Sequence, residues 1–122
     1  MPIDYLPDTN ILILLFNGAL AEPIPEGRLG YSVITEIELL SFSNLTESDE
    51  KLLRSYLSQL HRVMLESRVS EETIRLRRRY RLKTPDAIVV ASAVVMSAVL
   101  LTNDRQLQSI EEVTTQTLRM RE

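Results

Sequence analysis

The sequence predicts an α/β fold in which most strands of the sheet run parallel. Along the 122 residues, short apolar segments of strand type alternate with longer segments of helical periodicity, which is typical of a parallel sheet with crossover helices. The run 87–97 is rich in Ala and Val and apolar nearly all round, as expected for a helix buried on several sides. Because the length suits one domain, we expect a single domain over residues 1–122.

The first part of the chain predicts two strands and one helix. A strand over 3–6 is expected to end at Pro7, because proline has no N–H to donate to a sheet ladder. The polar residues that open segment 8–16 cap helices well, so this segment predicts a helix. The segment 17–30 holds glycines and prolines and predicts a loop that leads into a second strand over 29–34.

The central part predicts three helices and a strand. Apolar residues at helical spacing predict a helix over 35–43. The segment 46–49 is a plausible cap for a helix over 50–60, whose leucines share one face. A third strand is expected over 62–65. A further helix begins at Ser70, with acids in its first turn and arginines later, as the helix dipole favours.

The last part contains the clearest helix start in the chain. Residues 84–86 read Thr-Pro-Asp, which predicts a capping hydroxyl, a proline at the first helical position and an acid in the first turn. The buried helix 87–97 follows. A buried strand is expected over 99–102, a turn at 103–104 and a final strand within 113–118.

The composition excludes several kinds of catalytic site. The chain has no cysteine and three glycines, and its one histidine is His61. These counts exclude disulfides, a thiolate nucleophile, the usual zinc sites, a dinucleotide fingerprint and a Walker A loop. We expect His61 to lie at a helix end or on the surface, outside any site. An enzyme of this composition depends on carboxylates, hydroxyls, amides and a hard metal ion.

The apolar runs are too short to span a bilayer. Segment 11–16 has no polar residue and segment 87–101 is interrupted by serines, and neither reaches the length of a membrane helix or follows a basic n-region. We therefore expect a cytoplasmic protein without membrane association. Segment 11–16 is either wedged between the sheet and its neighbours or partly exposed to a partner.

Several acids lie where a parallel sheet binds ligands. Asp8 and Asp104 each follow a predicted strand, and Asp86 opens the buried helix, so all three are expected near the carboxyl edge of the sheet. Glu36 and Glu38 are about 200° apart around a helix, so only one of them can point toward the others. Each acid alone has an ordinary explanation as a helix cap or turn residue. Converging carboxylates repel one another, however, and such a cluster favours a bound Mg²⁺ or Mn²⁺.

The order of these acids resembles the PIN domain family, and within it the VapC toxins of toxin–antitoxin modules. The matching segments are Asp8-Thr9-Asn10, Ser32-Val33-Ile34-Thr35-Glu36-Ile37-Glu38-Leu39, Pro85-Asp86-Ala87-Ile88 and Leu101-Thr102-Asn103-Asp104-Arg105. The resemblance covers about residues 3 to 110, and its spacing from Ser32 favours Glu38 over Glu36 as the second acid. It implies a three-layer α/β/α domain that acts as a metal-dependent ribonuclease.

The resemblance also implies site residues and partners. The residues implied to hold Mg²⁺ or Mn²⁺ and to act in catalysis are Asp8, Glu38, Asp86 and Asp104, and the implied helpers are Thr9, Asn10, Thr102 and Asn103. The metal would activate a water for hydrolysis of an RNA phosphodiester. The implied partners are an RNA substrate, a VapB-like antitoxin and a second copy of the chain in a homodimer. In the family, the region of segment 11–16 helps to form the groove for the antitoxin. The alternatives are a PIN nuclease of RNA processing outside a toxin–antitoxin pair and a binding module without turnover.

A basic segment precedes the third acid. Residues 61–83 carry eight Arg and Lys against three Glu, although the whole chain has a net charge of −3. Arg75, Arg78 and Arg79 are expected on one side of their helix, with Leu76 and Tyr80 toward the core. This side is either an ordinary solvated face or a strip that binds RNA phosphates beside the acidic site.

Overall fold

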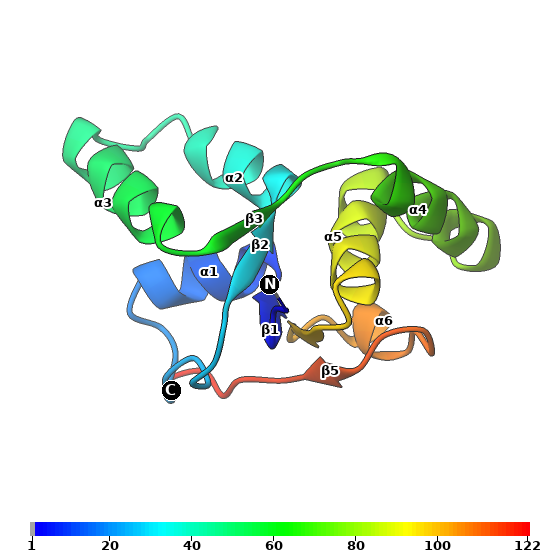
Figure 1. The fold of residues 1–122 in the computed structure, drawn as a ribbon. Coiled ribbons are helices and arrows are strands. Elements are labelled where there is room, and N and C mark those ends of the chain that lie inside the picture. Colours follow the sequence, from blue (N-terminus) through cyan, green and yellow to red (C-terminus); the bar gives the residue numbers. More distant parts are fainter. Residues whose placement is uncertain (1) are drawn as a thin grey trace.

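The computed structural model describes residues 2–122 as short parallel strands with helices on both sides (Figure 1). The strands are β1 (Tyr5–Pro7), β2 (Gly30–Ser32), β3 (His61–Val63), β4 (Val99–Leu101) and β5 (Thr115–Gln116). The helices are α1 (Thr9–Phe16), α2 (Val33–Leu40), α3 (Glu47–Ser58), α4 (Ser67–Arg79), α5 (Thr84–Val95) and α6 (Arg105–Gln108). The predicted α/β class is confirmed.

Every ladder between these strands is parallel. β4 lies between β1 and β5, while β2 pairs with β3. A parallel bridge between Tyr5 and Leu29 joins the two groups. The carboxyl ends of β1 and β4 therefore lie side by side, with Pro7 opposite Leu101 in the register.

The helices cover the strands from two sides. Figure 1 shows α1, α2 and α3 on one side of the strands and α4 and α5 on the other. One core lies between α1, α2 and α3 and includes Leu12 and Leu57. The larger core joins β1 and β4 to α4 and α5 and includes Leu100 and Val90. This arrangement of layers agrees with the α/β/α domain that the resemblance implies.

The apolar helix 11–16 is largely used inside the protein. Ile11 and Leu12 are fully buried in separate clusters, one toward β4 and one toward α3. Phe16 is 39% exposed and packs edge-to-face on Tyr56. The residues 13–15 are partly buried, so the run is interior at its start, and a partner interface at its end stays a prediction.

The α5 helix is buried as expected, but it begins differently. Residues Ala87–Ala93 are all buried, which fits their small and branched side chains. Lys83 occupies the N-cap position without a side-chain cap, and Thr84 is already helical. The prediction of a capping Thr84 hydroxyl was therefore wrong. The helix begins one residue earlier, and Pro85 and Asp86 both lie in its first turn, where a proline and an acid are favourable without a side-chain cap.

Other boundaries differ from the predictions for local reasons. β1 includes Pro7 as its last residue. Successive N–H groups along a strand point in opposite directions. The Asp8 N–H donates to the Leu101 carbonyl of β4, so the position of the missing Pro7 N–H faces away from β4 and no hydrogen bond to β4 is lost. The α2 helix begins two residues early, because the Ser32 hydroxyl caps it by accepting from the Ile34 N–H. The α4 helix likewise begins at Ser67 rather than Ser70.

The segment after β4 contains a short helix where only a turn was expected. Asp104 is the N-cap of α6 and accepts from the Gln106 N–H at 2.8 Å. The predicted cap before α3 is confirmed, since Thr46 and Asp49 form a reciprocal capping box. None of the helices in residues 2–122 is long and apolar enough to cross a membrane.

The central strand β4 should dominate the stability of the fold. Leu100 is fully buried in the larger core, so Leu100→Ala is expected to lower the free energy of unfolding by about 2–5 kcal/mol in urea titration. The same substitution at Leu52, which is 68% exposed, should change it by less than about 0.5 kcal/mol. Equal effects at the two positions would contradict the assignment of the core.

Candidate functional site

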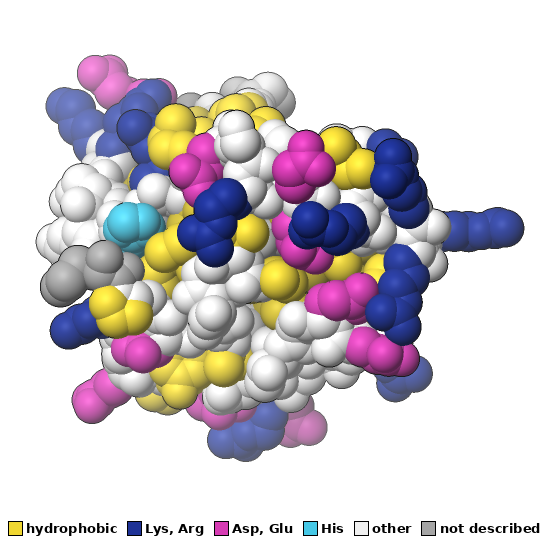
Figure 2. Space-filling model, turned by 45° about the vertical axis from the view of Figure 1, so that its right-hand side comes forward, with side chains coloured by type: hydrophobic (Ala, Val, Ile, Leu, Met, Phe, Trp, Pro, Cys, Tyr) yellow, Lys and Arg dark blue, Asp and Glu magenta, His cyan; other side chains and the backbone are white. Residues whose placement is uncertain are grey.

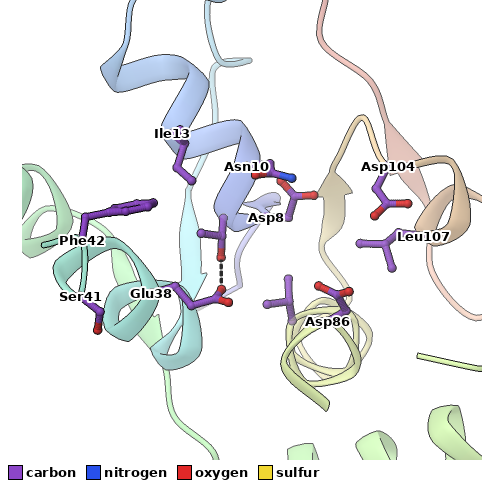
Figure 3. A pocket seen from close by; sticks show the side chains of 11 residues that line it. Asp8, Asn10, Ile13, Glu38, Ser41, Phe42, Asp86, Asp104 and Leu107 are labelled. Atoms are coloured by element: carbon purple, nitrogen blue, oxygen red, sulfur yellow. Dashed lines mark hydrogen bonds between the residues drawn. The ribbon is translucent and has the colours of Figure 1, made fainter. Parts of the chain in front are cut away.

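A pocket opens at the carboxyl ends of β1 and β4. Its lining includes the four acids singled out in the sequence, Asp8, Glu38, Asp86 and Asp104 (Figure 3). They come from four segments, the starts of α1, α5 and α6 and the second half of α2. The cavity volume is about 480 Å³, within the range of small-ligand sites.

Asp8 is the deepest of these acids. It follows β1, is only 6% exposed, and caps α1 by accepting from the Ile11 N–H at 2.9 Å. Burial raises the pKa of Asp8, and the charges of Asp104 and Asp86 add to the rise, while contacts from Thr102 and Ile11 oppose it. Its ionised form is therefore costly in the protein as it stands.

Glu38 reaches the pocket, and Glu36 on the same helix does not. The Thr9 hydroxyl donates to Glu38 Oε1 at 2.7 Å and lies 3.0 Å from the Thr35 hydroxyl. Glu36 instead accepts from Arg62 at 3.1 Å on another face of α2. The helical spacing thus places the two acids on different faces of α2. The acid that lines the pocket is Glu38, as the resemblance to the VapC toxins implies.

Asp86 and Asp104 face each other across the starts of two helices. Burial raises the pKa of Asp86, and the nearby charges of Asp104 and Glu38 raise it further, against the effect of Lys83. Asp104 is exposed, and its own N–H donates to the Thr102 hydroxyl at 3.0 Å. These mutual effects show that the acids share one electrostatic environment.

The donor set fits a hard divalent cation in its chemistry. All four groups are carboxylates, which suit Mg²⁺ and Mn²⁺, and their charges disfavour one another unless a cation compensates. Across residues 2–122, no three acidic or histidine side chains are close enough together to hold an ion as they stand. Glu38 and Asp104 are exposed, so a cation held by all four acids would require their side chains to rotate.

The four expected helpers divide between the pocket and its support. Thr9 and Asn10 line the pocket. Thr102 is fully buried. Its hydroxyl accepts from the Asp104 N–H, and its side chain opposes the rise in the pKa of Asp8. Asn103 is not a lining residue: its side chain both donates to and accepts from the Leu118 backbone, at 2.8 and 2.9 Å. The Asn103 amide thus holds the C-terminal segment, and its role as a helper of the site stays a prediction.

The arginines of α4 lie outside this pocket. Leu76 is buried beneath them as expected, and Tyr80 is partly buried. Arg75 pairs with Glu72 at 3.0 Å, and Arg79 bridges Glu111 and Glu112 at 3.1 Å. Figure 2 shows Lys and Arg gathered toward the right-hand edge of this face, with Asp and Glu side chains among them. The basic charge is therefore partly neutralised by neighbouring acids.

Sequence patterns did not single out the apolar side of the pocket. Ile13, Phe42 and Leu107 line it together with the acids. The one sequence signal for Phe42 is a large apolar residue in an otherwise mostly polar segment after α2. His61 lies at the start of β3 and is exposed outside this pocket, as expected.

The comparisons with known proteins agree on the family. The family model for the PIN domain matches residues 5–113. A chain of a toxin–antitoxin complex from Klebsiella pneumoniae is 31% identical, with a TM-score of 0.77 over 92% of this chain and 97% of that one. A chain of VapBC2 from Rickettsia felis, solved bound to a promoter DNA fragment, is 19% identical with a TM-score of 0.78 over 93% and 98%. No curated protein sequence gives a significant match.

The raised pKa of Asp86 predicts how its amide variant behaves. Because its pKa is raised, Asp86 binds a proton more tightly in the folded protein than in the unfolded chain. The protonated carboxyl therefore favours folding in acid, and this contribution is lost as the pH rises through the folded-state pKa. At pH 7 the ionised carboxylate destabilises the fold. Without added metal, Asp86→Asn should therefore raise the melting temperature at pH 7. The gain should vanish as the pH falls below the ordinary pKa of 3.8.

The measurement is thermal unfolding followed by circular dichroism across this pH range. Glu71→Gln, which removes an exposed acid on α4, is the control and should show no comparable gain. A destabilised Asp86→Asn variant at pH 7 would contradict the electrostatic description of the pocket.

Proposed function

From the premise that this chain belongs to the PIN domain family, in its VapC-type branch, we propose that it is a metal-dependent ribonuclease that acts as the toxin of a toxin–antitoxin pair. The observation that carries this proposal is the meeting of four carboxylates around one pocket at the carboxyl edge of the sheet. RNA is the proposed substrate, and Mg²⁺ or Mn²⁺ the proposed cofactor. The cytoplasm, where RNA is found, is the proposed location.

The four acids would hold the cation. Asp8, Glu38, Asp86 and Asp104 offer only oxygen ligands, and a bound Mg²⁺ or Mn²⁺ supplies charge neutralisation at the phosphate and a more acidic water. A cation also relieves the cost of ionising Asp8, which is buried beside other acids. The same groups that destabilise one another without metal thus become a ligand set with it.

The remaining residues of the site position these acids. Thr9 holds Glu38 by a hydrogen bond from α1 to α2, and Thr102 supports the start of α6. Asn10 is exposed at the pocket, and its amide N–H groups can donate to a phosphate oxygen. These contacts set the direction from which an RNA strand meets the carboxylates.

A VapB-like antitoxin is the proposed protein partner. The support for it is the likeness to a chain of a toxin–antitoxin complex, with 31% identity over nearly the whole of both chains. A homodimer, which the resemblance to the VapC toxins implies, is also part of the proposal. A neighbouring small gene for a DNA-binding protein would support this assignment.

Removal of one acid should abolish cleavage. Asp86→Asn is expected to lower the rate of RNA cleavage in Mn²⁺ by more than about a hundredfold, which exceeds the usual loss for residues that only support a metal ligand. Asp8→Asn should lose cleavage to the same extent, because it removes another carboxylate. The variant should stay folded, since asparagine also caps helices well. The assay is cleavage of total RNA by the purified protein, with sequencing of the new ends and with chelator as the metal-free comparison.

The chain offers a matched control for this assay. Glu36 lies two residues from Glu38 on α2 but pairs with Arg62 outside the pocket, so Glu36→Gln should retain cleavage while Glu38→Gln loses it. Equal activity of Asp86→Asn, Asp8→Asn and the wild type would refute the assignment of the site.

Arg75, Arg78 and Arg79 are proposed to bind RNA phosphates, with Arg78 contributing most. Arg75 and Arg79 already pair with acids, whereas Arg78 makes no ion pair with the residues that the structure describes. Arg78→Ala should weaken RNA binding and reduce the slope of log K against log salt by about 1. Arg54→Ala, on the exposed face of α3, should leave the slope unchanged. An unchanged slope for Arg78→Ala measured by fluorescence anisotropy would exclude this role.

A further inference from the structure

The pocket has an apolar wall opposite some of its acids. Phe42 and Ile13 line it on the side of α1 and α2, together with the Ser41 side chain. Figure 3 shows the Phe42 ring pointing from the end of α2 toward the pocket, on the side opposite Asp104. Carboxylates and an aromatic ring therefore face one and the same cavity.

The Phe42 ring has no evident structural use. It is 51% exposed and belongs to none of the hydrophobic clusters described above. Among the described residues the chain's other phenylalanine, Phe16, has an aromatic partner in Tyr56, but Phe42 has none. Other large apolar side chains of the chain are as exposed as Phe42, but Phe42 is the one among them that lines the pocket with the acids, where a ligand could cover its ring.

The backbone holds Phe42 in place beside the acids. Ser41 ends α2 as its C-cap, and the Leu45 N–H donates to the Phe42 carbonyl at 3.2 Å in the turn that follows. The Ser41 hydroxyl donates back to the Ile37 carbonyl, so it does not offer its proton to a ligand beside the ring. The wall therefore presents an aromatic face with little hydrogen-bonding capacity.

We propose that Phe42, with Ile13 beside it, forms a stacking subsite for an unpaired nucleobase, next to the phosphate that a cation bound by the carboxylates would hold. This inference rests on the proposed ribonuclease function. Single-stranded RNA offers exposed base faces joined covalently to its phosphates, and proteins bind such bases by stacking them on aromatic rings. Because every base has a π face and Ser41 is already hydrogen-bonded, the subsite should accept all four bases with little preference.

Continuity with the acidic site favours RNA over a protein segment at this wall. A ligand that touches both the ring and the acids through a bound cation needs an apolar flat group and an anion within one small unit, and a nucleotide has both. A protein segment would need an aromatic or apolar side chain and an anionic group placed separately to meet the ring and the cation, whereas every nucleotide of an RNA strand carries both. Docking of a protein alone is therefore the alternative result of the test.

A tryptophan reporter tests the contact directly. The chain has no tryptophan, so Phe42→Trp places a single fluorophore at the wall, and Asp86→Asn in the same chain prevents cleavage. With Mg²⁺ present, a short random-sequence single-stranded RNA should quench this emission, whereas inorganic polyphosphate, which carries charge without bases, should not. Phe16→Trp in the same background is the matched control and should show no quenching.

Cleavage kinetics provide a second measurement. In the wild-type background, Phe42→Leu should lower kcat/KM for RNA roughly 5- to 150-fold, mainly through KM, as expected for the loss of one stacked base. Phe42→Tyr, which restores a ring, should recover most of this loss, and Phe16→Leu should leave kcat/KM unchanged. A purely structural role would not separate leucine from tyrosine in KM alone.

The outcomes distinguish this inference from the proposed function. Quenching by RNA alone supports the subsite even if the wild-type protein cleaves nothing, in which case the proposed function fails. Equal quenching by RNA and polyphosphate overturns the subsite, because the signal then reports charge. Active wild-type enzyme with unchanged Phe42→Leu kinetics and no quenching also overturns it, and leaves the ring to a protein partner.

Discussion

The arrangement of the site depends on one constraint, the meeting of several carboxylates where parallel strands end. Asp8 follows β1 and Asp104 follows β4, and these strands are neighbours in register. Each acid also satisfies backbone N–H groups at a helix start, Ile11 for Asp8 and Gln106 for Asp104. Helix capping is therefore one use of these carboxylates, and metal binding is a second use in the proposed function. The helix N-termini at the pocket offset part of the negative charge. The pKa values of Asp8 and Asp86 are nevertheless raised, first by burial and then by the charges of the neighbouring acids.

Two separate cores hold the acids in this arrangement. The α2 helix, which carries Glu38, packs with α1 and α3, whereas α5, which carries Asp86, packs with α4 and the central strands. The sheet between these cores fixes their separation, and the hydrogen bond from Thr9 to Glu38 joins α1 to α2 at the pocket itself. A change in either core should therefore alter the distances between the carboxylates, and the core residue Leu107 also lines the pocket itself.

Charge on the surface follows a different logic from charge in the pocket. The basic residues of α4 are interleaved with acids, and Arg79 is held by Glu111 and Glu112 at the end of the helix. The net charge of −3 therefore combines an acidic pocket, in which Asp8 is buried, with a surface that carries charges of both signs. A strand of RNA that approached the acids without a cation would meet repulsion, so the metal and the flanking cationic side chains have complementary roles in the proposed function.

The sequence by itself determined the kind of site and most of the elements. The absence of cysteine, the single histidine and the order of the acids restricted the chemistry to carboxylates, and helical spacing showed that Glu36 and Glu38 could not share a face. Local patterns also predicted the buried helix α5, because its composition leaves no polar side for solvent. Only the tertiary structure decided which neighbours each side chain meets. It assigned Asn103 to the Leu118 backbone, neutralised Arg79 with distant acids and brought Phe42 to the pocket. These contacts join residues far apart in the chain, and local periodicity carries no information about such pairs.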